Sequence, residues 1–203
     1  MVVIQRVVPL LSLCLGSSAA FSIVDAEDLE RKNVGDACVK AMSADIDCPA
    51  YVRSFKQSSY RASLGNKTLT DEICTTTCSA SLKAWFDTVA SACATEKLGD
   101  GVPQFHGGYI WAGWNETCVK DTKTNRYCND ILRDAEELEY EEELCLDCNR
   151  RKLEIMQSSP YSVYDSFYRS KLEEVYEKCG GSGPTEIPAA AFWREEIRGF
   201  LPY

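Results

Sequence analysis

The residues of this sequence with the greatest capacity for chemistry are its eleven cysteines. Thiolates bind zinc, attack electrophiles or form disulfides, and their spacing helps to decide among these roles. Cys145 and Cys148 form a CxxC pair, and Cys74 with Cys78 could complete a four-cysteine zinc site. A thioredoxin-type redox pair would need a βαβ setting, which this CxxC segment lacks. Because only one histidine, His106, is present to help bind a metal, we interpret the cysteines as halves of disulfides and expect no metal or other cofactor.

His106 is also the only imidazole that could serve as a base for a serine or cysteine nucleophile. It lies in a Phe-His-Gly-Gly context, and no nucleophile elbow of the GxSxG type is present. Paired carboxylates could serve a glycosidase, but 31 acidic residues give no basis for choosing a pair. We therefore predict a non-enzymatic protein without catalytic residues. An uncharacterised secreted hydrolase remains as an alternative.

Tyr109, Trp111 and Trp114 lie among glycines within residues 96–117. Flat, exposed rings can stack on the faces of sugars, so chitin-type glycan binding through the loop 109–114 is a second alternative function. The same rings could instead fill the core, because buried aromatic side chains supply a large apolar area. The expected partners are accordingly a cell-wall glycan or a host or extracellular protein.

The N-terminus accounts for the odd number of cysteines. Residues 1–20 combine the apolar run Val7–Leu15 with small residues before Phe21, a pattern typical of a cleaved signal peptide. The apolar run is short for a membrane anchor, the rival interpretation. Cleavage would remove Cys14 and leave an even number, which fits an oxidising compartment. We expect a secreted, extracellular protein with five disulfides of open pairing, formed by Cys38, Cys48, Cys74, Cys78, Cys93, Cys118, Cys128, Cys145, Cys148 and Cys179.

Charge and modification motifs add further expectations. Asn66-Lys-Thr68 and Asn115-Glu-Thr117 match the N-glycosylation sequon, so Asn66 and Asn115 are predicted glycosylation sites. The formal net charge of −9 repels phosphate backbones, which makes nucleic acid an unexpected partner. Beyond residue 20 no apolar run is long enough to span a membrane, so no membrane contact is expected after cleavage.

A helix over residues 71–93 is the strongest element available to position these cysteines. One face of it carries a single apolar stripe, formed by Cys74, Cys78, Leu82, Trp85, Val89 and Cys93. The run Thr75-Thr76-Thr77 opposes a helix, because β-branched residues are poor helix formers. We expect packing and disulfides to override that preference. The helix would then be a spine bonded to the segments around Cys38 and Cys48 and around Cys145, Cys148 and Cys179.

Three further helices are indicated by apolar spacing. One begins at Pro49, one spans Leu144–Met156 with Lys152 intruding on its apolar face, and one covers about 164–179. Glycines break residues 96–117, and the segment from Cys118 to Cys128 suits a hairpin or an ordered loop. The predicted fold class is mainly α: a small disulfide-rich helical domain with a central Gly/Trp-rich loop or short hairpin.

The chain divides into four expected regions. Residues 1–20 are the signal peptide and residues 21–37 a loose leader. Residues 38–179 form the disulfide-rich helical module, and residues 180–203 form a linker and C-terminal tail. The sequence leaves the oligomeric state open.

Several motifs, taken in order, match one family pattern. They are Asp47-Cys48, Cys74-Thr-Thr-Thr-Cys78, Leu82-Lys-Ala-Trp85 with Cys93, Cys118-Val-Lys-Asp121, Cys128-Asn-Asp130, Cys145-Leu-Asp-Cys148, Ser159-Pro160 and the closing Cys179. As a set they resemble the cysteine-rich N-terminal module that precedes LysM domains in secreted fungal LysM-domain-containing proteins. The resemblance implies a fungal, effector-like interaction module rather than an enzyme.

Two departures limit what this resemblance implies. LysM domains in the family bind chitin and related N-acetylglucosamine polymers, but the 24 residues after Cys179 show no LysM pattern. Chitin binding is therefore not carried over to this chain. Asn149-Arg-Arg-Lys152 also replaces a stretch that we expect to be more apolar in relatives, which predicts a more exposed helix there.

Overall fold

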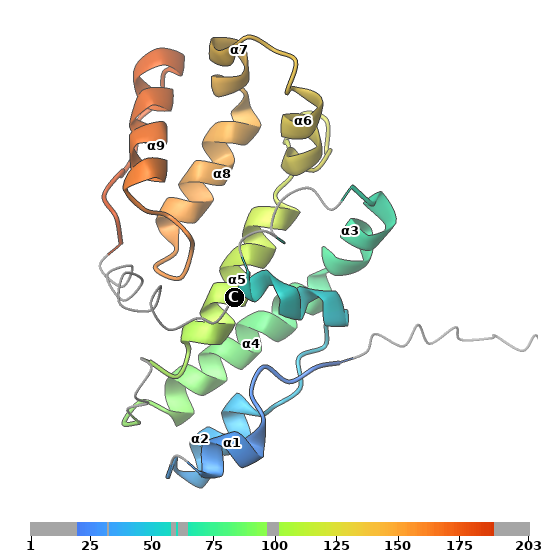
Figure 1. Cartoon of the computed structure of the whole chain (residues 1–203), viewed down its shortest axis with the longest axis vertical. Coiled ribbons are helices and arrows are strands. Elements are labelled where there is room, and N and C mark those ends of the chain that lie inside the picture. The colour runs from blue at the N-terminus through green and yellow to red at the C-terminus, as the bar shows by residue number, and fades with distance from the viewer. Residues whose placement is uncertain (1–19, 32, 58–59, 61–64, 97–101, 189–203) are drawn as a thin grey trace, which may run out of the picture.

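The computed structural model describes residues 20–31, 33–57, 60, 65–96 and 102–188 (Figure 1). This part of the chain is helical, which confirms the predicted mainly-α class, and its strand-like pairing is confined to two isolated bridges. In chain order the elements are α1 (Ala26–Glu30), α2 (Asp36–Met42), the 3₁₀ helix η1 (Ala50–Lys56), α3 (Lys67–Ile73), α4 (Thr76–Ala92), α5 (Phe105–Cys118), α6 (Cys128–Asp134), α7 (Tyr140–Leu144), α8 (Asp147–Ser158) and α9 (Ser166–Cys179).

The predicted helix over residues 71–93 is present in two pieces. Helix α4 buries the expected stripe, formed by Cys78, Leu82, Trp85 and Val89. Helix α3 precedes it, and the chain breaks between the two at Cys74 and Thr75. The Thr75 hydroxyl accepts a hydrogen bond from the backbone N–H of Cys78 at 3.2 Å, which makes Thr75 the N-cap of α4. The threonine run that opposed one continuous helix therefore marks the start of the second.

Five disulfides divide the molecule into two lobes. We call residues 20–118 the first lobe, where the pairs are Cys38–Cys93, Cys48–Cys78 and Cys74–Cys118. Residues 119–188 form the second lobe, where the pairs are Cys128–Cys148 and Cys145–Cys179. Figure 1 shows α6 to α9 gathered at one end of the molecule and α1 and α2 at the other, with α3, α4 and α5 between them. Each described disulfide closes a loop inside one lobe.

All ten predicted disulfide cysteines are thus paired, but the expected role of the spine is wrong in one respect. Its cysteines Cys74, Cys78 and Cys93 bond only to segments of the first lobe. They do not reach the cysteines at 145, 148 and 179: Cys145 pairs with Cys179 and Cys148 pairs with Cys128, and both bonds lie inside the second lobe. The second lobe has a hydrophobic core of its own, so it does not need α4 as a support.

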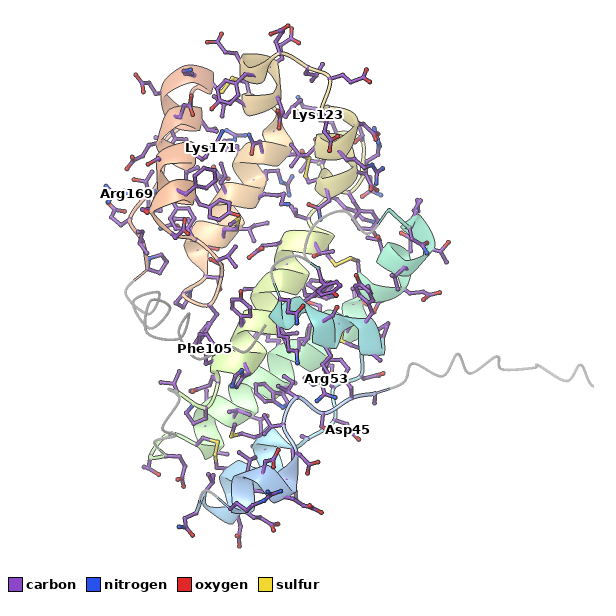
Figure 2. The ribbon with its side chains drawn as sticks, in the orientation of Figure 1. Asp45, Arg53, Phe105, Lys123, Arg169 and Lys171 are labelled. Atoms are coloured by element: carbon purple, nitrogen blue, oxygen red, sulfur yellow. A yellow bond between two sulfur atoms is a disulfide. The ribbon has the colours of Figure 1, made fainter. Side chains whose placement is uncertain are left out.

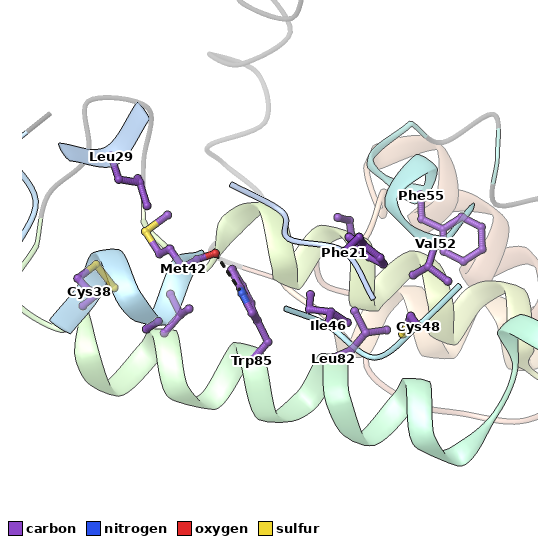
Figure 3. Close-up of a cluster of buried hydrophobic side chains, with 14 of the residues drawn as sticks. Phe21, Leu29, Cys38, Met42, Ile46, Cys48, Val52, Phe55, Leu82 and Trp85 are labelled. Atoms are coloured by element: carbon purple, nitrogen blue, oxygen red, sulfur yellow. Dashed lines mark hydrogen bonds between the residues drawn. A yellow bond between two sulfur atoms is a disulfide. The ribbon is translucent and has the colours of Figure 1, made fainter. Parts of the chain in front are cut away.

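The first lobe has its core between α1, α2, η1 and α4, and Figure 3 shows that core in close-up. Trp85 lies at its centre, only 4% exposed, and its indole N–H donates to the Met42 carbonyl at 3.3 Å. Phe21 is also buried and exchanges two backbone hydrogen bonds with Ile46, at 3.2 and 2.9 Å. The expected loose leader at residues 21–37 is therefore wrong for this segment: apolar side chains such as Phe21 and Leu29 anchor it to the core.

The Gly/Trp-rich segment is the helix α5 and not the predicted loop. An added Cβ at Gly107 would lie 1.9 Å from Cζ3 of Trp85, and one at Gly108 would lie 2.6 Å from Cγ of Tyr161. These glycines therefore allow close approach of α5 to its neighbours. Local propensity alone suggested a loop, because glycine costs about 1 kcal/mol relative to alanine in a helix interior. Packing against Trp85 and Tyr161 outweighs that preference.

A compact turn follows α5, as expected for the segment between Cys118 and Cys128. Lys120 and Tyr127 form an isolated antiparallel bridge. The carboxylate of Asp121 accepts hydrogen bonds from the backbone N–H groups of Lys123 at 3.0 Å and Thr124 at 2.6 Å. Asn125 has a φ of 57°, in the left-handed region that asparagine tolerates. The turn is therefore fixed by its own side chains.

The second lobe packs α8 against α9, and α9 occurs where apolar spacing predicted it. The helix predicted from Leu144 begins later, at Asp147, because Leu144 ends the separate helix α7. Leu153, Tyr164 and Leu172 are among its buried side chains. The chain after α9 returns to this core: the Tyr164 hydroxyl donates to the Thr185 carbonyl at 3.0 Å. Residues 189–203, the expected C-terminal tail, lie outside the described residues. No helix in the described ranges is both long and apolar enough to cross a membrane.

Candidate functional site

Apart from the chain itself, the two lobes are joined by side-chain contacts. Tyr127 of the second lobe donates its hydroxyl hydrogen to Asp71 of the first at 2.9 Å. Tyr161 packs edge-on against Phe86, with ring centroids 5.3 Å apart, and lies over Gly108. Because no described disulfide crosses this boundary, the relative position of the lobes depends on these contacts and on the packing of α5 against α6 and α8.

A polar group is also placed between the lobes, around Lys152 of α8. Its ammonium group donates to the side-chain carbonyl of Asn129 in α6. Burial lowers the pKa of Lys152, and the nearby negative charge of Glu116 partly opposes that shift. Glu116 lies on α5 and is only 4% exposed. The sequence predicted that Lys152 is a charged residue on an otherwise apolar helix face. In the structure it forms a hydrogen bond at the lobe boundary.

A hollow of about 520 Å³ opens beside this boundary and is the candidate functional site. We call it the junction hollow. The first lobe contributes Gly65 and the first two turns of α3, and the second lobe contributes the turn after α5 and one face of α6. Its lining residues are Gly65, Lys67, Asp71, Lys120, Asn125, Arg126, Tyr127, Asp130 and Arg133.

Tyr127 and Asp71 form the polar centre of the junction hollow. Hydrogen bonds from Lys67, at 2.5 Å, and from Tyr127 hold the pKa of Asp71 below its ordinary value. Burial raises the pKa of Tyr127 to about 12, and the bond to Asp71 acts in the same direction. The Nζ atom of Lys120 lies 4.4 Å from the centroid of the Tyr127 ring. Asp71 is therefore ionised and Tyr127 protonated across the ordinary pH range.

The two arginines of the junction hollow are held by carboxylates on α6. Arg126 donates to Asp134, which lowers the pKa of that carboxyl. Arg133 lies 3.1 Å from an oxygen of Asp130. Across the described residues, no three histidine, cysteine, aspartate or glutamate side chains come together in a way that could hold a metal ion. The hollow thus offers guanidinium and ammonium donors rather than metal ligands.

A second hollow, of about 720 Å³, lies between the turn at 122–123 and α8. The stretch from Asn149 to Lys152 lies on α8, and its Arg150 and Arg151 line this hollow. Arg150 donates to Asp147 one turn earlier in the same helix. These arginines are therefore on the surface of the helix, as their charge led us to expect, and only Lys152 turns toward the lobe boundary.

The predicted glycan-binding residues do not share one exposed face. Trp114 donates its indole N–H to the Ile73 carbonyl at 2.9 Å, and Trp111 packs against Phe86 with ring centroids 5.5 Å apart. Both tryptophans are half-buried against the core of the first lobe. Tyr109 instead stacks on Phe105 at the start of α5, with ring centroids 5.9 Å apart. The helical conformation of the segment therefore separates Tyr109 from the two tryptophans.

The other predicted residues occupy different surroundings. Asn66 is exposed and caps α3 by accepting a hydrogen bond from the backbone N–H of Leu69 at 3.2 Å. Asn115 is half-buried on α5, and Thr117 of its sequon is only 1% exposed. His106 is exposed and contacts the ring of Phe105 edge-on. Figure 2 shows Phe105 at the start of α5, well separated from Lys123 in the turn of the second lobe.

The residues that sequence reasoning missed are those of the junction hollow. Lys67 is far from Arg126 and Arg133 in the sequence, and the three residues share no motif. The available signal was local: Lys120 and Arg126 flank a well-formed turn next to a cysteine. The Cys74–Cys118 disulfide and the hydrogen bond from Tyr127 to Asp71 hold that turn beside α3.

Comparison with known proteins supplies the family. A family described as the secreted LysM effector N-terminal domain matches residues 19–178. The non-secreted LysM effector LysM19 of Penicillium expansum is 34% identical over 160 residues, which are 76% of this chain and 13% of that protein. The non-secreted LysM effector LysM15 of the same fungus is 31% identical over 172 residues, 82% of this chain and 12% of that protein. No solved structure matches this chain.

These relatives correct the predicted location. Both are named non-secreted effectors, which contradicts the prediction of a secreted, extracellular protein. That prediction depended on the composition of residues 1–20, which lie outside the described residues except for Ala20. An apolar run followed by small residues is a compositional signal, and composition does not determine whether a segment is processed. The matched part spans about an eighth of the length of these relatives. Since the family match covers most of its 203 residues, the chain belongs to the secreted LysM effector N-terminal domain family.

Proposed function

We propose that this chain is a non-enzymatic recognition module of a fungal protein of the LysM effector type. One observation carries the proposal: the side chains with the greatest capacity for chemistry are committed to structure. All ten cysteines from Cys38 to Cys179 are in disulfides, so none of them is a thiolate nucleophile or a metal ligand. A module whose ten cysteines are all used in disulfides in this way is suited to presenting a fixed surface to a partner.

The carboxylates support the same conclusion. A glycosidase needs a carboxylic acid whose pKa is raised so that it can donate a proton. Hydrogen bonds from Thr124 hold the pKa of Asp121 below its ordinary value. Arg169 does the same for Glu173 on α9. These carboxylates, like Asp71, are ionised partners of neighbouring donors, which suits a structural role better than acid catalysis.

The relatives support a modular role. In both proteins from Penicillium expansum the matched segment is a small part of a much longer chain. A small segment of that kind, with its own disulfides and core, is well suited to serve as one recognition unit among others.

The experiment combines turnover with binding. The purified chain is incubated with chromogenic chitin oligomers, β-glucans and ester substrates, and in parallel with insoluble chitin and β-glucan beads. We expect no turnover above a heat-treated control. Turnover that a single carboxylate substitution abolishes would overturn the proposal and restore the hydrolase alternative.

Glycan binding remains a second candidate, but at a different set of rings. The observation that favours it is the stacked pair of Phe105 and Tyr109, whose ring planes are 19° apart. Retention on chitin beads should then be lost in Tyr109→Ala and kept in Tyr60→Ala, an exposed tyrosine on a separate segment. Failure of the unsubstituted chain to bind any bead would sink this candidate.

A further inference from the structure

The junction hollow has a charge balance opposite to that of the whole chain. The sequence holds 22 lysines and arginines against 31 acidic residues. The hollow is lined by four cations, Lys67, Lys120, Arg126 and Arg133, against two carboxylates. An acidic surface is sufficient for solubility, so solubility does not explain a local excess of positive charge. The excess of positive charge in the junction hollow therefore indicates a role in binding a negatively charged group.

The hollow draws its cations from both lobes. Lys67 belongs to α3 of the first lobe, whereas Lys120, Arg126 and Arg133 belong to the second. The hydrogen bond between Tyr127 and Asp71 crosses the same boundary inside the hollow. Ligand sites occur preferentially between such units, where a bound molecule can contact both.

The present partners of these cations show which chemical groups they accept. Lys67 bonds to Asp71, Arg133 to Asp130 and Arg126 to Asp134, all of them carboxylates. The pairs of Lys67 and Arg126 are solvent-exposed, and Arg133 is exposed although its partner Asp130 is half-buried. Exposed ion pairs contribute little to stability, so an incoming anion can compete for the same donors. The guanidinium group also matches the geometry of carboxylate, sulfate and phosphate oxygens.

Lys120 differs from the other three cations. Its ammonium group lies over the Tyr127 ring, and among the described residues it forms no ion pair with a carboxylate, although its charge helps to lower the pKa of Asp71. An ammonium group on an aromatic face keeps hydrogen-bonding capacity toward the open side of the ring. Lys120 is therefore the donor that an incoming anion can engage without displacing any part of the chain.

We infer that the junction hollow binds an organic ligand through an oxyanion group, with Lys120 as the first donor and Lys67, Arg126 and Arg133 around it. This inference deepens the proposed recognition function and rests on it. A volume of about 520 Å³ is in the range of sites for organic ligands, which run from about 300 to 1,000 Å³, and is too large for one inorganic ion. The bound oxyanion links the two lobes by charge, where no described disulfide does.

The test is calorimetric titration of the full chain with three probes of similar size. Glucose 6-phosphate carries a phosphate, citrate carries carboxylates and glucose carries no charge. We expect the two anions to bind and glucose not to bind, and the stronger of the two identifies the oxyanion class. Inorganic phosphate serves as a fourth probe and should bind more weakly than glucose 6-phosphate, because it lacks the organic body.

Lys120→Gln is the informative variant, because Asp71, the described carboxylate on which the charge of Lys120 acts, keeps its hydrogen bonds from Lys67 and Tyr127 when this ammonium group is removed. We expect its affinity for the better anion to fall about tenfold, the loss expected for one charge-assisted hydrogen bond. Lys123→Gln is the matched control, since Lys123 is an exposed lysine of the same turn but does not line the junction hollow. Its affinity should be unchanged. Near-ultraviolet circular dichroism verifies that both variants are folded.

Two results would overturn the inference. One is the absence of binding by both glucose 6-phosphate and citrate, and the other is an equal loss of affinity in the two lysine variants, which would indicate only a general effect of charge. Either result leaves the turnover and bead assays of the proposed function unaffected. Conversely, turnover of a bound probe would contradict the non-enzymatic proposal while leaving the site in place.

Discussion

Replacing Gly107 by alanine adds one methyl group where α5 packs against α4. The new Cβ would lie 1.9 Å from Cζ3 and 2.3 Å from Cε3 of Trp85, well inside van der Waals contact. Trp85 cannot easily move aside, because it is 4% exposed and its indole N–H bonds to the Met42 carbonyl. Either the ring or helix α5 must therefore shift.

The expected change in the free energy of unfolding combines three effects. Alanine is more favourable than glycine in a helix interior by about 1 kcal/mol. Overpacking a well-filled core costs about 1–3 kcal/mol. Displacing Trp85 also endangers its hydrogen bond, a further cost of about 1 kcal/mol. We therefore expect Gly107→Ala to lower the free energy of unfolding by about 1–3 kcal/mol, the reverse of its effect at an exposed helical site.

Urea denaturation followed by circular dichroism, with the disulfides intact, measures this change. Ala84→Gly on the exposed face of α4 is the control, because it reports helix propensity without a change in core packing and should cost about 1 kcal/mol. If the segment were the flexible loop that its glycines suggested, Gly107→Ala would be neutral. Stability at or above that of the unsubstituted chain would refute the close packing of α5 on Trp85.

Three further predictions concern the lobes, a tryptophan and a tyrosine. A protease site engineered into residues 121–125 should give, after cleavage, two fragments that separate on a non-reducing denaturing gel, and linked fragments would contradict the disulfide pattern. Trp114→Phe should lower the free energy of unfolding by about 1 kcal/mol, because the hydrogen bond to the Ile73 carbonyl is lost. Retention on the glycan beads should be unchanged. Loss of retention in a folded variant would indicate that Trp114 contacts the glycan. The raised pKa of Tyr127 means that its contribution to stability is complete below pH 10 and is lost as the pH rises through about 12. Phenolate absorbance should therefore show a late titration step that Tyr127→Phe makes smaller but does not remove, because burial also raises the pKa of Tyr164 to about 12. An unchanged titration curve would count against the buried hydroxyl of Tyr127.

Much of the helical fold could be predicted from local patterns. The stripe Cys78, Leu82, Trp85 and Val89 repeats at helical spacing, and α4 buries it as predicted. The end of α8 at Ser158 also follows from local sequence, because Ser159 precedes Pro160 and the residue preceding a proline avoids helical conformation. Such features depend on neighbours within about one or two turns, so the sequence displays them directly.

Features that depend on distant partners could not be predicted. Gly107 and Gly108 suggest a loop until the approach of Trp85 and Tyr161 is known. The division into two lobes could not be predicted either, because it depends on which cysteines pair. Ten cysteines allow very many pairings, and their spacing in the sequence does not select one of them. The sequence allowed Trp111 and Trp114 either to form an exposed sugar-binding surface or to fill the core, and the helix directs both toward the core.

The position of the candidate site follows from one of these unpredictable pairings. The Cys74–Cys118 disulfide joins the end of α3 to the end of α5. The chain leaves α5 directly into the turn that carries Lys120 and Tyr127, so this bond places the turn beside α3. The cations of the two lobes are thus brought together by a bond that belongs wholly to the first lobe, while no described disulfide crosses the boundary to the second lobe. A bound oxyanion would supply the missing connection, which explains why positive charge gathers at this boundary in an otherwise acidic protein.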